Sequence, residues 1–89
     1  MTDPSVNSSV DWKDIKYREI FEEELRGLVR RRESDPLCVV EDIERVLKNL
    51  YIMDGADWYG RGDVQDIIMA ATIAAYEHFI AGWKAERRL

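Results

Sequence analysis

The sequence predicts an all-α fold of three helices in a single small domain. Apolar residues recur at spacings of three and four along three segments, no segment alternates apolar and polar residues as a strand would, and helix-start and helix-stop residues separate the segments. The chain has 89 residues, of which 46% are apolar, which is enough for one domain with its own core. Residues 1–9 are small and polar, so we expect a disordered tail there and a single helical domain over residues 10–89.

The first helix is expected over residues 11–32. Asp11 stands at the N-cap position with Asp14 three residues further on, an arrangement that resembles a capping box. Glutamates precede arginines along the segment, which is the order that the helix dipole favours. One apolar stripe is formed by Tyr17, Phe21, Leu25 and Leu28.

The second helix is expected over residues 36–53. Asp35 suits the N-cap and Pro36 the first helical position, because a proline there loses no hydrogen bond. Gly55 is available as the left-handed residue that ends a helix. Its predicted core face consists of Val39, Val40, Ile43, Val46, Leu47 and Leu50.

The third helix, expected over residues 63–87 with Asp63 as its cap, is apolar around its circumference. A peripheral helix would carry polar residues on the side away from the core. One face of this helix consists of Val64, Ile67, Ile68, Ala71, Ala75 and Phe79. The opposite face consists of Met69, Ile73, Tyr76, Ile80 and Trp83.

This pattern predicts that the third helix is central and lies at an oligomer interface. Two other helices in so short a chain are not expected to cover both of its faces, so the second face would meet another chain. Another copy of the same chain, as a homodimer or higher oligomer, is the favoured partner, and a different protein is the alternative. Trp58 and Tyr59, in the loop before the third helix, are secondary interface candidates.

Composition excludes several classes of function. The formal net charge of −5 argues against nucleic-acid binding, which depends on a basic surface. No apolar run is long enough to predict a membrane span, since Asp66, Glu77 and His78 interrupt the third helix. A single cysteine, Cys38, and the lack of a signal peptide indicate a cytoplasmic protein. We expect Cys38 and His78 to have structural roles, because neither has a second residue with which to form a catalytic pair.

Two pairs of carboxylates suggest an alternative function. Glu41 and Glu44 lie three residues apart in the second helix, and Asp63 and Asp66 have the same spacing in the third. If they converged, in one chain or across an oligomer interface, four carboxylates could hold Mg²⁺. The layout resembles the MazG-like all-α nucleotide pyrophosphatases, although Asp63 stands where that family has Glu. The resemblance implies Mg²⁺-dependent nucleoside triphosphate pyrophosphatase activity. The other interpretation is that these are solvated residues and helix-start acids.

The favoured hypothesis is a small acidic protein–protein interaction module that associates with itself through the third helix. It predicts no catalytic residue, no metal and no cofactor. A further alternative is a small acidic inhibitor or antitoxin-like protein that covers a basic site on its target.

Overall fold

The computed structural model describes residues 5–56 and 63–87, and the side chains of residues 12–55 and 64–86. Three helices occupy these residues: α1 (Ser5–Ser34), α2 (Val40–Ala56) and α3 (Asp63–Arg87). The described residues contain no strand. The predicted all-α fold of three helices is therefore confirmed, and α3 has the predicted bounds.

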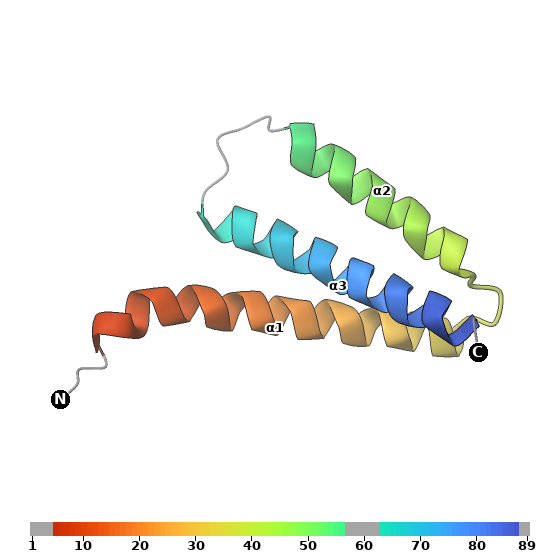
Figure 1. Cartoon of the computed structure of the whole chain (residues 1–89), viewed down its shortest axis with the longest axis horizontal. Coiled ribbons are helices and arrows are strands. Elements are labelled where there is room, and N and C mark those ends of the chain that lie inside the picture. The colour runs from red at the N-terminus through yellow and green to blue at the C-terminus, as the bar shows by residue number, and fades with distance from the viewer. Residues whose placement is uncertain (1–4, 57–62, 88–89) are drawn as a thin grey trace.

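The helices are arranged with α3 between the other two (Figure 1). α1 and α3 run in the same direction, and α2 runs antiparallel to both (Figure 1). α3 contacts α1 and α2, whereas the backbones of α1 and α2 make no contact with each other in the described part of the chain. The predicted central position of α3 is thus confirmed.

α1 begins earlier than the sequence indicated. The helix starts at Ser5, so Asp11 and Asp14 lie inside it and its first turn contains no acidic residue. No glycine or proline lies between Ser5 and Asp11 to stop the helix from extending toward the N-terminus. The helix ends at Ser34, whose hydroxyl donates a hydrogen bond of 2.8 Å to the carbonyl of Arg30.

α2 begins at Val40 rather than at Pro36, because Asp35 and Pro36 form a turn instead of a helix start. The N–H of Cys38 donates to the Asp35 carbonyl at 3.0 Å, and the N–H of Leu37 donates to Asp35 Oδ1 at 3.0 Å. These bonds close a turn in which proline supplies the fixed φ.

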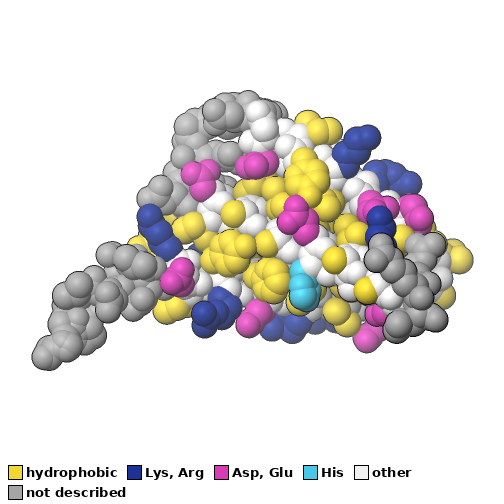
Figure 2. Space-filling model, in the orientation of Figure 1, with side chains coloured by type: hydrophobic (Ala, Val, Ile, Leu, Met, Phe, Trp, Pro, Cys, Tyr) yellow, Lys and Arg dark blue, Asp and Glu magenta, His cyan; other side chains and the backbone are white. Residues whose placement is uncertain are grey.

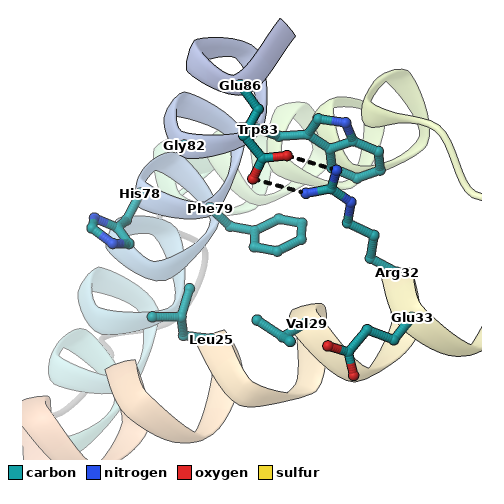
Figure 3. A pocket seen from close by; sticks show the side chains of 9 residues that line it. All are labelled: Leu25, Val29, Arg32, Glu33, His78, Phe79, Gly82, Trp83 and Glu86. Atoms are coloured by element: carbon teal, nitrogen blue, oxygen red, sulfur yellow. Dashed lines mark hydrogen bonds and ion pairs between the residues drawn. The ribbon is translucent and has the colours of Figure 1, made fainter. Parts of the chain in front are cut away.

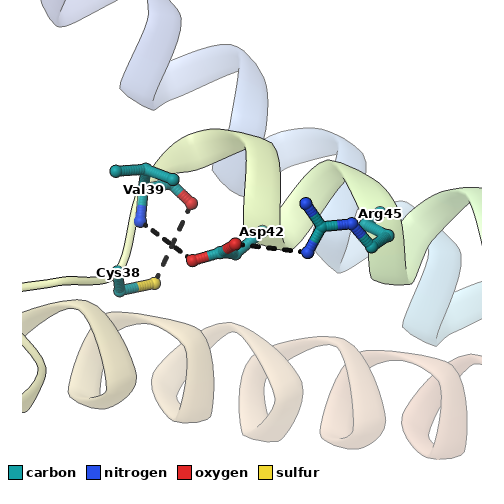
Figure 4. A network of polar contacts seen from close by, with 4 residues as sticks. All are labelled: Cys38, Val39, Asp42 and Arg45. Atoms are coloured by element: carbon teal, nitrogen blue, oxygen red, sulfur yellow. Dashed lines mark hydrogen bonds and ion pairs between the residues drawn. The ribbon is translucent and has the colours of Figure 1, made fainter.

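The cap of α2 comes from inside the helix. Asp42 Oδ2 accepts the N–H of Val39 at 3.3 Å, and Asp42 Oδ1 pairs with Arg45 at 3.3 Å (Figure 4). This is the returning half of a capping box, in which an acidic residue satisfies a free N–H before the first turn. At its other end α2 continues to Ala56, so Gly55 is helical, and its backbone is not in the left-handed region.

The core lies where the C-terminal halves of α1 and α3 meet the N-terminal half of α2. One continuous cluster of buried residues forms it: Leu28, Cys38, Val40, Ile43, Leu47, Phe79 and Ile80. Ala71 and Ala75 of α3 are also fully buried, and their small side chains permit a neighbouring helix to pack closely. We call this half of the molecule the closed end.

The opposite half, which we call the open end, comprises the N-terminal half of α1, the C-terminal half of α2 and the N-terminal half of α3. Here α2 diverges from α3 and α1 projects beyond both (Figure 1). Most of the exposed large hydrophobic residues lie in this half: Trp12, Ile15, Tyr17, Tyr51, Ile52, Met53 and Val64.

Candidate interaction surfaces

The α3 face that we expected to meet another chain is buried at Ile80 and partly buried elsewhere by contacts within this chain. Ile80 is only 7% exposed and belongs to the core with Val40 and Ile43 of α2. Ile73 and Tyr76 are half-buried and pack against the same core. The expectation that two helices would leave this face free is wrong at Ile80, because both α1 and α2 pack against α3. That the rest of the face meets another chain stays a prediction.

Trp83 is half-buried and already has partners at the closed end. The guanidinium of Arg32 lies 4.0 Å from the centroid of the Trp83 ring, and the Phe79 ring meets it edge-on at 5.7 Å. Arg32 also forms two hydrogen bonds with Glu86, at 2.9 and 3.4 Å (Figure 3). Arg32 thereby lowers the pKa of the Glu86 carboxyl, first through these hydrogen bonds and then through its charge.

A cavity of about 550 Å³ lies between α1 and α3 beside this cluster (Figure 3). Its lining combines apolar side chains with an ionic rim: Leu25, Val29, Arg32, Glu33, His78, Phe79, Gly82, Trp83 and Glu86. The ring of His78 meets that of Phe21 edge-on at 5.7 Å, which agrees with a structural role. Cys38 is buried in the core, with its Sγ 4.0 Å from the Val39 carbonyl, and likewise has a structural place.

A second groove lies between α2 and α3 at the open end. It has a volume of about 170 Å³ and is lined by Leu50, Gln65, Ile68, Met69 and Thr72. Met69 is therefore the one predicted interface residue of α3 that lines a groove at this end. Because the helices diverge here, these half-buried side chains are not sealed from solvent.

A third hollow, of about 530 Å³, lies along α1 and is lined by Asp14, Tyr17, Arg18, Phe21 and Glu22. Ile15, which lies near it in the sequence, is 53% exposed. Sequence reasoning did not identify this surface. The available signal was an apolar residue, Ile15, that lies off the predicted apolar stripe of the helix.

Two of the four candidate metal ligands, Glu44 and Asp66, lie far apart within one chain. Glu44 forms an ion pair with Lys84, near the C-terminus of α3, whereas Asp66 lies near its N-terminus. Lys84 follows Asp66 by eighteen positions along the helix, which corresponds to about 27 Å. No group of three or more possible metal ligands occurs among the described residues, which include Glu41 but not the side chain of Asp63.

Two tyrosines of the α2–α3 region have altered pKa values. Burial raises the pKa of Tyr76, the nearby carboxylate of Glu24 raises it further, and Arg31 opposes the shift. The hydroxyl of Tyr51 donates a hydrogen bond to the carboxylate of Glu77, and this bond raises the Tyr51 pKa. The Tyr51–Glu77 hydrogen bond joins α2 to α3.

The remaining predicted interface residues, Trp58 and Tyr59, lie outside the described residues. Among the residues that the structure covers, no helix has the length and apolar character needed to cross a bilayer. Comparison with protein-family models, with curated proteins and with solved structures finds no match to this chain. The resemblance to the MazG-like pyrophosphatases therefore gains no support from these comparisons.

Proposed function

We propose that this chain is a small, non-catalytic protein–protein interaction module of the cytoplasm that associates with a second copy of itself. The observation that carries the proposal is the open groove between α2 and α3, where the half-buried Met69 and Ile68 face solvent at the point where the helices diverge. Exposed apolar side chains surround this end of the molecule, notably those of Ile52, Met53 and Val64.

The exposed apolar side chains support association. Ile52, Met53 and Val64 are 62%, 53% and 44% exposed, and a stable interface of standard size covers about 800 Å² of each partner. One face of the molecule also carries hydrophobic side chains over its centre, with most basic side chains toward its edges (Figure 2). Apolar area of this kind is favourable to bury against another chain.

The interface would use part of the predicted α3 surface. Met69 lines the groove directly, and Ile73, Tyr76 and Trp83 are half-buried residues of the same helix. Ile80 has no part in the contact, because it is already buried in the core. A charge at Ile80 is therefore expected to unfold the chain, whereas a charge at Met69 is expected to prevent association.

Light scattering coupled to size-exclusion chromatography tests the proposal. We expect the wild-type chain to be a dimer or larger at high micromolar concentration, and Met69→Glu to lower the mass of the assembly without loss of helical circular dichroism. Ala85→Glu introduces the same charge at an exposed position of the same helix and should leave the mass unchanged. A wild-type chain that stays monomeric at high micromolar concentration contradicts the proposed self-association.

A further inference from the structure

Four charged residues of alternating sign form a ridge along α1: Asp14, Arg18, Glu22 and Arg26. They are spaced four residues apart and are all exposed, so they follow one inclined row on the helix surface. Three of them line the hollow of about 530 Å³ on α1, together with the aromatic rings of Tyr17 and Phe21. We call these four residues the α1 ridge.

The charged side chains of the α1 ridge are available for contacts with another chain. Residues four apart on a helix, such as Arg18 and Glu22, are close enough to form ion pairs with each other. In the described part of the chain, however, no ion pair or hydrogen bond engages any of the four side chains. The charges of the ridge are therefore not used in holding the three helices of one chain together.

The charges of the α1 ridge match those of a second, antiparallel copy of the same ridge. Reversing the sequence of signs of the ridge (negative, positive, negative, positive) places each charge opposite one of the other sign. We propose that two copies of this chain pair antiparallel along α1, with Arg18 opposite Glu22 of the second copy and Asp14 opposite Arg26 of the second copy. A twofold axis repeats each of these pairs, as it must in an isologous contact.

The same axis also brings apolar side chains together. With Arg18 opposite Glu22, the exposed Ile15 lies opposite Leu25 of the second copy, a half-buried side chain that already packs against the core of its own chain. Inclined rows of this spacing pack into each other when two helices cross at an interaxial distance of about 8–10 Å. Burial of the exposed Ile15 side chains supplies the apolar part of the contact, while the ion pairs set orientation and register more than strength.

Other arrangements of the two ridges fit less well. A parallel pair in register places like charges opposite each other. A parallel pair shifted by one helical turn places opposite charges together. This contact is not twofold symmetric, however, so each copy would bind a further copy and the assembly would grow without limit. The antiparallel pair is the arrangement that both matches the charges and closes.

This inference rests on the proposed self-association and assigns it a second surface, distinct from the α2–α3 groove. Two isologous surfaces on one chain build an assembly larger than a dimer. Each surface on its own would still hold two copies together. Variants of the two surfaces therefore report on them separately.

The test is a charge exchange followed by sedimentation velocity at low ionic strength. We expect Arg18→Glu and Glu22→Arg, each alone, to weaken the α1 contact by roughly tenfold, because each replaces two attractive pairs with two repulsive ones. The double variant R18E/E22R should recover wild-type association. An equimolar mixture of the two single variants should recover it as well, because each of the two central pairs then joins a carboxylate of one variant to a guanidinium of the other.

A matched control uses the same helix. Arg30→Glu makes the same change of net charge as Arg18→Glu, at an exposed position of α1 that faces no charge in this arrangement. We expect it to leave association unchanged. Circular dichroism of each variant shows that any loss of mass does not come from unfolding.

The outcomes separate the two proposals. The α1 contact is supported if the single variants weaken association and the double variant and the mixture restore it. This holds even if the wild type is only a dimer and Met69→Glu leaves that dimer intact. Association that is indifferent to both single variants overturns the α1 contact, and if Met69→Glu then lowers the mass, the groove proposal stands alone. A wild-type chain that is monomeric at every concentration overturns both.

Discussion

The two ends of this molecule are built from the same three helices but differ in how completely they bury their apolar residues. At the closed end, side chains from α1, α2 and α3 form one cluster in which Ile43 is fully buried. Ion pairs between Arg32 and Glu86 and between Lys84 and Glu44 join the helices around it. At the open end, Ile52 of α2 is 62% exposed and the groove around Met69 remains open.

The difference shows that the closed end supplies the stability of the chain, whereas the open end is available for contacts. A domain of this length buries a modest part of its surface, so its net stability is at most a few kcal/mol. Leaving apolar residues of α2 exposed is unfavourable for the isolated chain, since each could contribute to a larger core. A partner that covers them would recover that contribution.

Replacing an isoleucine at each end gives the largest expected contrast. Ile43→Ala removes a fully buried side chain and should lower the free energy of unfolding by about 2–5 kcal/mol, which is enough to leave much of the chain unfolded. Ile52→Ala makes the same chemical change at the open end and should shift the free energy of the isolated chain by less than about 0.5 kcal/mol. Urea unfolding followed by circular dichroism measures both. Equal effects at the two positions would mean that the ends do not differ in packing.

A substitution of intermediate effect compares two faces of α3. Ala75 is fully buried, whereas Ala81 is exposed. Ala75→Leu adds three carbon atoms where a helix packs closely and should destabilise the chain by about 1–3 kcal/mol. Ala81→Leu should be nearly neutral, because leucine is almost as good a helix former as alanine. Thermal unfolding checks the pair, and a stable Ala75→Leu variant would show that α3 has room on that face.

Local sequence signals predicted the helices well and their ends unevenly. The apolar stripes of α2 and α3 identified Ile43, Leu47, Ala75 and Phe79 as core residues, because burial follows helical periodicity directly. The start of α2 was missed, since Asp35 and Pro36 suit a turn as well as a helix cap, and the choice between them depends on the hydrogen bond that Asp42 makes to Val39.

The candidate interface was harder to predict, because it depends on how the helices are placed relative to one another. Periodicity showed that α3 has two apolar faces but not that α2 would lie against the face that contains Ile80. Nor can the pattern of one helix show that α2 diverges from α3 toward Met53 and leaves Met69 beside an open groove. The distance between Glu44 and Asp66 was not predictable for the same reason: Glu44 belongs to the closed end and Asp66 to the open end.

The smallest predicted effect concerns the bond between Tyr51 of α2 and Glu77 of α3, the two helices that diverge toward the open end. The Tyr51 pKa is raised above its ordinary 10.0, because ionisation of the hydroxyl breaks a hydrogen bond and places two negative charges together. A raised pKa in the folded state means that this stabilisation is fully present below pH 10.0 and is lost as the pH rises through the raised value.

An ultraviolet titration of tyrosinate, taken as the difference between the wild type and Tyr51→Phe, should show a late-ionising hydroxyl. Glu77→Gln should move its pKa back toward 10.0, because the acceptor then carries no charge. Since the bond is exposed, its loss should change unfolding only slightly. A Tyr51 pKa that does not respond to Glu77→Gln would show that this hydrogen bond does not hold α2 to α3.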